Sequence, residues 1–271
     1  MSGASAYLHN MRARNYLLKT VKRFIRYTHA WSRYAPGVCN MCGREVPSFL
    51  PYRIGTASIS PILRELDIIG SDLGRFSCPF CGCTDRERHL LAFMQRSNLL
   101  ELRGKQVLHF APERNLRKYI QSVQPTAYIQ GDLFPGEPEI TRVDITAIQF
   151  PDAQFDLLIA NHVLEHVPND IAAIKEIVRV LKPGGHAILQ TPFAAKLEHS
   201  LSLPQIRSSE TRLLLYGQED HVRLYGSDIF GLVTSAGLIP KIQFHGDLLP
   251  DMDAHRYGMN LREPFMCWVK P

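Results

Sequence analysis

Hydrophobic and polar residues follow one another along residues 150–193 in a pattern that predicts a strand, a polar loop, a helix and a second strand. Phe155–Ala160 and residues 186–191 are short apolar runs, typical of strands that are buried on both faces. Apolar residues between them recur at steps of three and four, as in a helix with one buried face, and the Pro-Gly-Gly at 183–185 ends that helix. Two strands joined by a helix are expected to lie parallel. The polar loop 161–167 then lies at the carboxyl end of a strand, where such sheets bind ligands.

The same alternation continues on both sides of this unit. Strands are expected at 105–110, 127–130, 142–144, 239–244 and 265–269, and helices over 113–123 and 226–236. Strands that alternate with helices predict a doubly wound α/β sheet, which we expect to occupy residues 101–271.

The composition favours a globular enzyme. The chain has 271 residues, 45% of them hydrophobic, which is enough to bury one full core with an appendage. Its formal net charge of +5 is mild and does not by itself call for a nucleic-acid partner. The sequence has no apolar run of about 18 residues, and its first residues lack the apolar stretch of a secretory signal. We therefore expect a cytoplasmic protein.

Four of the six cysteines form two pairs with the spacing of zinc ligands, and these pairs predict a small zinc-ribbon-like region over residues 37–100. The predicted ligands of a structural zinc ion are Cys39, Cys42, Cys78 and Cys81. Cys83 could replace Cys81, although the Cys78/Cys81 spacing fits better. The insert between the pairs, residues 44–77, is long enough to carry its own secondary structure. Cys267 lies in an apolar run and is expected to be a small core residue.

Residues 1–36 form a third region, in which basic residues are interleaved with apolar ones as in a basic amphipathic helix. This helix could lie on an anionic membrane, dock on an acidic partner, or pack on its own domain. A charged segment after the second cysteine pair begins another helix. There Arg86, Arg88 and His89 could face an anionic ligand or form a solvated first turn.

Several motifs occur in the same order as in one known group of enzymes. They are Asp132 after the second strand, Asp144-Ile145, Phe150-Pro-Asp152, Phe155-Asp156, the loop His162-Val-Leu-Glu-His-Val167, Leu181-Lys-Pro-Gly-Gly185 and His221-Val-Arg-Leu-Tyr-Gly226. From about residue 103 to the C-terminus, the chain resembles the class I S-adenosylmethionine-dependent methyltransferases, in particular the group similar to methyltransferase type 11. The resemblance implies a Rossmann-like, seven-stranded methyltransferase sheet, here with an N-terminal helix and the zinc-ribbon-like appendage.

The resemblance also implies a set of residues for binding S-adenosyl-L-methionine. Asp132 would accept hydrogen bonds from the ribose hydroxyls and Asp144 from the adenine amino group, although both could simply be turn or strand-end residues. The loop after the first strand departs from the family, because His109 replaces the usual acid and the glycine positions carry Ala111, Glu113 and Asn115. Glu113 could supply the missing carboxylate. The full predicted set is Ala111, Glu113, Asp132, Leu133, Asp144, Ile145, Asn161 and His162.

Methyl transfer to oxygen or nitrogen is helped by a base with a pKa near neutrality, and this suits histidine. The predicted catalytic candidates are His221, His162 and His166, with Arg223 and Tyr225 predicted to bind substrate. We expect the acceptor to be a small molecule or a saccharide, and nucleic acid is disfavoured. The alternatives are a methyltransferase-like binding module without activity and an RNA or protein methyltransferase. A rival interpretation takes 162–166 as the zinc-protease motif H-x-x-E-H, but that motif needs one continuous helix, and Pro168 suggests that the helix starts later.

Overall fold

The computed structural model describes residues 37–271, so the predicted basic helix and its membrane or acidic partner lie outside the described residues. A single seven-stranded sheet organises this part of the chain, as predicted. Its order is β10 (Ile239–Pro240), β11 (Cys267–Val269), β8 (Leu181–Ile188), β7 (Phe155–Ala160), β4 (Gln106–Phe110), β5 (Ala127–Asp132) and β6 (Thr141–Arg142). The strands from β8 to β6 are parallel to their neighbours, and β11 is antiparallel to both β8 and β10.

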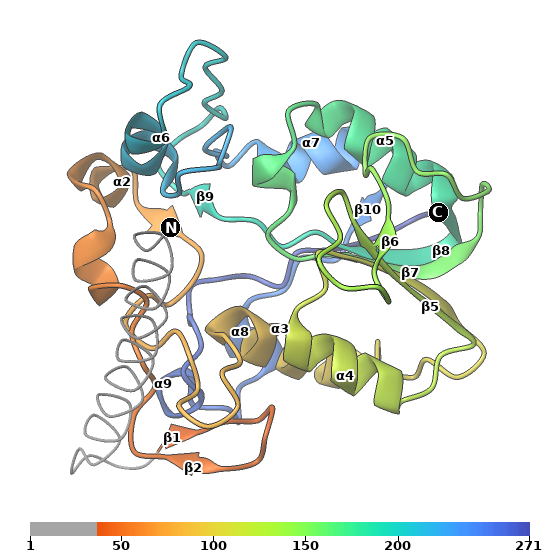
Figure 1. Cartoon of the computed structure of the whole chain (residues 1–271), viewed down its shortest axis with the longest axis horizontal. Helices are drawn as coiled ribbons and strands as arrows, with labels where there is room; N and C mark the ends of the chain where they lie inside the picture. The colour runs from red at the N-terminus through yellow and green to blue at the C-terminus, as the bar shows by residue number, and fades with distance from the viewer. Residues whose placement is uncertain (1–36) are drawn as a thin grey trace, which may run out of the picture.

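Helices cover both faces of the sheet and make three layers (Figure 1). On one face α5 (Asp170–Val180) and α7 (Ile229–Ser235) bury apolar side chains such as Ile174 and Val233 in a core with Leu158 of β7. On the other face α3 (Asp85–Arg96) and α4 (Arg114–Ser122) bury residues such as Phe93 and Leu116 in a second core. The alternation of buried strands and amphipathic helices is therefore what produces the layered fold.

The β7–α5–β8 unit has the predicted order, with one shift at its second strand. The Asn169 side chain accepts a hydrogen bond from the Ala172 N–H and caps the start of α5. The Pro-Gly-Gly segment does not lie between helix and strand, because β8 already begins at Leu181 and pairs with Phe155 across a register shift. Gly185 has to be glycine at this irregularity, since a Cβ there would lie 2.8 Å from the Lys182 carbonyl oxygen.

The insert between the cysteine pairs has its own secondary structure, as expected. It contains a 3-10 turn, η1 (Gly55–Ser58), the helix α2 (Pro61–Glu65) and a short strand, β3 (Ile68–Ile69). β3 pairs antiparallel with β9 (Phe193–Ala194), which follows the fifth strand of the main sheet, and α2 packs on α6 (Ser209–Tyr216). In Figure 1 these four elements form one group beside the sheet. The insert is thus attached to a late loop of the sheet domain.

The helix α3 belongs to the sheet domain in its packing, although the sequence placed it in the region 37–100. Its buried residues Leu90–Met94 share one core with Val107 of β4 and Leu157 of β7. The appendage proper is smaller: it consists of the hairpin β1 (Gly37–Val38) and β2 (Glu45–Val46), the insert and the second cysteine pair. The remaining short elements are η2 (Leu164–His166), α8 (His245–Leu248) and α9 (Ala254–Tyr257). Among residues 37–271, no helix has the length and apolar character needed to cross a bilayer.

Candidate functional site

Four cysteine side chains from the two predicted pairs converge on one point of the appendage. The sulfur atoms of Cys39, Cys42, Cys78 and Cys81 all lie within 4.8 Å of one another. The Cys39 and Cys81 sulfurs are 3.8 Å apart, and those of Cys42 and Cys78 are 4.0 Å apart. Four sulfurs that bind one zinc ion at about 2.3 Å are separated by roughly 3.8 Å in a tetrahedron. The donor set and its spacing therefore fit a closed, structural zinc site.

The two cysteine pairs lie in turns with the same backbone geometry. Gly43 donates its N–H to the Cys39 carbonyl, and Gly82 donates to the Cys78 carbonyl in the same way. Both glycines have a positive φ, +71° and +75°, which L side chains adopt only with strain. Cys83 lies outside the group of four, with its sulfur 3.4 Å from that of Cys39. The grouping thus favours Cys81 over Cys83 as the fourth ligand.

The predicted cofactor residues lie along the carboxyl ends of β4, β5, β6 and β7, which we call the carboxyl edge. Glu113, just after β4, connects two of these strands: its carboxylate contacts His109 Nε2 at 3.1 Å and accepts a hydrogen bond from the Asn161 side chain. His109 is fully buried, and its Nδ1 lies 2.8 Å from the Tyr128 hydroxyl. Burial by itself would raise the pKa of Glu113, but the contacts with His109 and Asn161 lower it below its usual value. Glu113 thus places a carboxylate at this edge of the sheet.

The glycine-poor loop after β4 nevertheless adopts a backbone geometry typical of glycine. Ala111 has φ +44° and donates its N–H to the Gly131 carbonyl of β5 at 2.8 Å. An alanine in this region costs roughly 1–2 kcal/mol, so the rest of the loop has to hold it there. The turn keeps the shape that glycine would give, and the departure from the family lies in the side chains.

Asp132 and Asp144 follow neighbouring strands, and each uses one oxygen in a local turn. Asp132 Oδ1 accepts the Phe134 N–H at 2.8 Å. Asp144 Oδ1 accepts from the N–H and the hydroxyl of Thr146, and these hydrogen bonds hold the pKa of Asp144 below its usual value. Of their neighbours, Leu133 is exposed and Ile145 is buried. Each turn fixes one oxygen of the carboxylate and orients the second.

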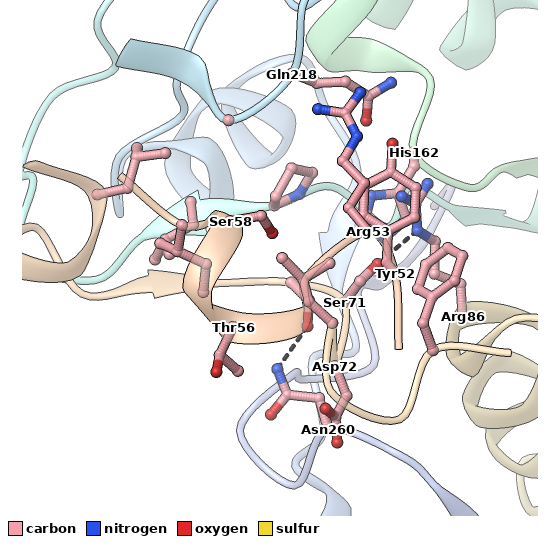
Figure 2. Close-up of a pocket in the computed structure, with 18 of the residues that line it drawn as sticks. Tyr52, Arg53, Thr56, Ser58, Ser71, Asp72, Arg86, His162, Gln218 and Asn260 are labelled. Carbon is pink, nitrogen blue, oxygen red and sulfur yellow. Dashed lines mark hydrogen bonds between the residues drawn. The ribbon is translucent and has the colours of Figure 1, made fainter. Parts of the chain in front are cut away.

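A cavity of about 340 Å³ lies beside the carboxyl edge (Figure 2). Three separate parts of the chain line it: the insert with the start of α3, the loops after β7 and α6, and the segment after α9. Its wall combines apolar side chains with polar ones and includes Tyr52, Arg53, Thr56, Ser58, Leu63, Ser71, Phe76, Arg86, His162, Tyr216, Gln218, His221, Asn260 and Arg262. Of these, the sequence singled out only His162, His221 and, with alternatives open, Arg86. The others carry no local motif and come together only in the fold.

His162 lies in the wall of this cavity, between two buried carboxylates. Its Nδ1 is 3.2 Å from Glu165 Oε1, and its Nε2 is 3.4 Å from Glu263 Oε1. Burial and nearby Arg86 would lower the pKa of His162, but the two glutamates raise it above its usual value. Burial would raise the pKa of Glu165, yet His162 and the other nearby imidazoles lower it to about 2. The site therefore holds charged groups away from water, as active sites commonly do.

The other two predicted catalytic histidines lie next to each other, and of these two only His221 lines the cavity. His221 donates from Nδ1 to the Tyr216 carbonyl at 2.9 Å, and its Nε2 lies 3.9 Å from Glu165 Oε1. His166 packs edge-on against the His221 ring and has its Nδ1 3.3 Å from Asp220 Oδ2. All three histidines thus gather around Glu165, which the sequence named only in the protease motif.

That protease motif does not have the helix it needs. His162 has φ +55°, and only the three residues Leu164–His166 are helical, in a 3-10 turn. His162 and His166 therefore do not lie on one face of a continuous helix, and the H-x-x-E-H interpretation is wrong on geometry.

The predicted substrate residues Arg223 and Tyr225 are buried and engaged elsewhere. Arg223 donates to the carbonyls of Val167 and Pro168 and forms an ion pair with Asp170, which also accepts from the Tyr225 hydroxyl. Neither side chain is among those that line the cavity. Their geometry is that of a brace for the loop between β7 and α5.

The charged start of α3 is not the solvated turn that the sequence allowed. Arg88 is fully buried among backbone carbonyls, and His89 contacts His245 Nδ1 at 3.0 Å and Glu263 at 3.6 Å. Arg86 alone of the three faces the cavity, with its Nε donating to the Ser71 hydroxyl at 2.6 Å (Figure 2).

Asp85, the first residue of α3, is a buried carboxyl whose effect on stability can be measured. It is 1% exposed, and burial together with the charge of Glu263 raises its pKa to about 7. Because the folded-state pKa lies above the unfolded value, the wild type loses stability as pH rises from about 4 to about 7. The free energy of unfolding of Asp85→Asn, relative to the wild type, should therefore rise by about 2–4 kcal/mol between pH 4 and pH 8. Urea unfolding at several pH values measures this. Parallel pH profiles for wild type and Asp85→Asn would contradict the prediction.

Comparison with known proteins agrees with this architecture. Residues 95–189 match the sequence model of a family described as the methyltransferase domain. The match runs from the end of α3 through β4, β5 and β7 to β8, so it includes the carboxyl edge. Over these residues the chain is therefore similar to methyltransferase domains.

Two curated proteins of Mycobacterium tuberculosis, from different strains, are similar to part of the chain. Each is named a probable S-adenosylmethionine-dependent methyltransferase and is 26% identical to the chain over 123 residues. The matched residues make up 44% of this chain, and the chain spans only 41% of the length of those relatives.

Solved structures of similar shape include the YcgJ protein of Bacillus subtilis, which is 15% identical, with a TM-score of 0.44 over 67% of this chain and 99% of that one. Another is the 1,6-didemethyltoxoflavin-N1-methyltransferase of Burkholderia thailandensis, solved with 1,6-didemethyltoxoflavin and S-adenosylhomocysteine. It is 16% identical, with a TM-score of 0.42 over 66% of this chain and 78% of that one.

Proposed function

We propose that the protein transfers a methyl group from S-adenosylmethionine to an oxygen or nitrogen atom of a small molecule or saccharide. The observation that carries this proposal is the position of two consecutive residues. Asn161 donates to Glu113 at the carboxyl edge, whereas His162 lines the cavity. The edge and the cavity thus share one wall, as transfer between two molecules bound side by side requires.

The residues at the carboxyl edge fit the methyl donor. Asp132 would accept from the ribose hydroxyls with the oxygen that its turn leaves free, and Asp144 would accept from the adenine amino group. Ile145 offers an apolar side chain to the adenine ring. Glu113 would accept from the methionine amino group in place of the missing family acid. When bound, S-adenosylmethionine supplies an electrophilic methyl group on a positively charged sulfur.

The cavity fits an acceptor of modest size. A volume of about 340 Å³ is at the lower end of the range for small-molecule sites. Tyr52 and Phe76 offer ring faces, while Arg86, Gln218 and Asn260 offer hydrogen-bond donors (Figure 2). Such a mixed wall suits a hydroxylated ring, with an apolar face and a polar rim, better than an extended polymer.

The chain's own contribution to the transfer is to hold the acceptor in line with the donor and to remove its proton. His162 and His221 both line the cavity. His221 is the one placed to take a proton from an acceptor hydroxyl or amine, because both ring nitrogens of His162 face the carboxylates of Glu165 and Glu263. Those carboxylates fix the orientation of the His162 ring.

We propose a structural role for zinc at Cys39, Cys42, Cys78 and Cys81. A closed set of four thiolates leaves no position for a substrate. The insert that lines the cavity begins and ends at this site, so zinc would hold both ends of the insert. The appendage would then act on the reaction only by shaping the acceptor cavity.

Calorimetry with S-adenosylhomocysteine tests the cofactor part of the proposal. The wild type should bind, and Asp132→Ala should weaken binding about 10- to 100-fold, because hydrogen bonds to the ribose hydroxyls contribute roughly 1.5–3 kcal/mol when they are made to a charged group. Glu101→Ala is the matched control, since Glu101 is an exposed acid that precedes β4 at the opposite edge of the sheet. If the wild type did not bind at millimolar ligand, or if both variants bound equally well, the proposed function would fail.

A further inference from the structure

A group of three potential metal ligands lies next to the cavity, separate from the four cysteines. One carboxylate oxygen of Glu165 and one ring nitrogen each of His166 and His221 lie within 4.8 Å of one another. Glu165 and His166 come from η2, after the fourth strand of the sheet, and His221 comes from the loop after α6. His221 also lines the cavity, so the group faces the place where an acceptor would bind.

The hydrogen bond of His221 determines which of its nitrogens is free. Its Nδ1 lies 2.9 Å from the Tyr216 carbonyl, which can only accept, so the hydrogen is on Nδ1. Nε2 is then the nitrogen left for a ligand, and it lies 3.9 Å from Glu165 Oε1. This distance is too long for a hydrogen bond between the two atoms. A cation between them would bind to both.

The environment of Glu165 also suits a cation. Its side chain is 1% exposed, and Oε2 accepts from the Thr191 hydroxyl at 2.9 Å, which fixes the plane of the carboxylate. Within residues 37–271, Oε1 has no hydrogen-bond partner of good geometry. The ring closest to it is that of His162, which also contacts a second buried carboxylate, Glu263.

The third member of the group has the support typical of a metal ligand. His166 Nδ1 lies 3.3 Å from Asp220 Oδ2, as in the carboxylate–histidine pairs that orient ligating imidazoles. The Tyr216 carbonyl does the same for His221. In each ring Nδ1 therefore contacts an acceptor, and Nε2 is the nitrogen left for a metal ion.

We propose that Glu165, His166 and His221 bind a divalent first-row transition-metal ion. Two imidazoles and one carboxylate suit such an ion better than Mg²⁺ or Ca²⁺, which prefer oxygen ligands. Ligand atoms that share an ion at about 2.0–2.2 Å lie roughly 3–3.5 Å apart, so the 3.9 Å between His221 Nε2 and Glu165 Oε1 must close by a few tenths of an ångström. Three protein ligands leave positions open toward the cavity. There the ion would bind an acceptor oxygen and make its proton easier to remove. That last role rests on the proposed function, whereas binding of the ion does not.

The test uses the full chain with its zinc retained. Elemental analysis gives the metal content as purified, and Mn²⁺ and Co²⁺ are then titrated separately, with free Mn²⁺ followed by its paramagnetic resonance signal. We expect one metal site per chain beyond the four-cysteine site. His166→Ala and His221→Ala should each weaken it at least tenfold. His199→Ala is the control, because its side chain is 82% exposed and lies outside the group.

Two further measurements keep the outcomes distinct. Circular dichroism shows whether each variant is folded, and His166, at 29% side-chain exposure, is the substitution expected to leave the fold intact. If the folded wild type holds no metal beyond the cysteine site, or if the folded His166→Ala variant binds as tightly as the wild type, the metal proposal is overturned. Calorimetry with S-adenosylhomocysteine runs in parallel, so that a wild type that binds this ligand but no additional metal ion contradicts this inference alone.

Discussion

Replacing Cys78 and Cys81 with serine is expected to remove bound zinc and to lower the stability of the protein by several kcal/mol. In small zinc domains the binding free energy of the ion is folding free energy, of the order of 10 kcal/mol. Here part of it would be kept, because β3 and α2 of the insert also pack on β9 and α6. Elemental analysis gives the zinc content, and urea unfolding followed by circular dichroism gives the loss of stability.

The control for this experiment is Cys267→Ala, which removes a buried thiol far from the two pairs along the chain. This variant should keep its zinc and lose only about 1 kcal/mol, as expected for one small core side chain. Zinc that stays bound to the double serine variant, or zinc loss without a change in unfolding, would show that the four cysteines do not have the proposed structural role.

Arg88→Met is expected to destabilise the protein by about 3–5 kcal/mol, because it removes a buried charge from a cage of acceptors. The guanidinium group donates to five backbone carbonyls and lies over the Phe49 ring, with Cζ 3.9 Å from the ring centroid. Those carbonyls belong to Arg75, Phe76, Cys83, Tyr257 and Gly258. Methionine has a similar length but cannot donate, so the carbonyls would stay buried without partners.

The matched control is Arg96→Met on the same helix. Arg96 is 40% exposed and pairs with Asp251, so its loss should cost less than about 1 kcal/mol. Arg88→Lys should fall between the two, since an ammonium group keeps the charge but cannot reach carbonyls on several sides. Urea unfolding of the three variants measures these differences. An equal loss of unfolding free energy for Arg88→Met and Arg96→Met would show that the carbonyls around Arg88 do not depend on its guanidinium group.

The sequence predicted the parts of the fold that depend on local periodicity. β7 begins and ends at the predicted residues, and α4 and α5 lie within one or two residues of theirs, because each has a continuous apolar face. The third, sixth and seventh strands are shorter than predicted, with β10 only Ile239–Pro240. Apolar runs at the edge of a sheet do not specify how many residues pair, since that depends on the neighbouring strand.

The residues of the candidate site also fall into two groups: those in short sequence motifs, which could be predicted, and those that meet only in the fold. The cysteine pairs and the acids after β5 and β6 belong to short motifs, and the structure brings the four cysteines together as expected. Glu263 could not be predicted, because its partners His89 and His162 lie far away in the sequence. Arg223 was predicted to bind substrate, yet its side chain is buried in an ion pair with Asp170 and does not line the cavity. Residue type alone does not tell whether a charge will meet a ligand or a buried partner.

The pairing of β3 with β9 attaches the insert, residues 44–77, to the sheet domain as a separate unit. Residues 44–77 begin and end at the cysteine cluster, pair with β9, pack on α6, and supply much of the cavity wall. The residues that we propose for binding the methyl donor lie on other segments. If the proposed function holds, a different insert anchored at the same two cysteine pairs would change the acceptor and leave the donor residues unchanged. Residues 44–77 would then determine which acceptor binds, and they are the segment to exchange in grafting experiments.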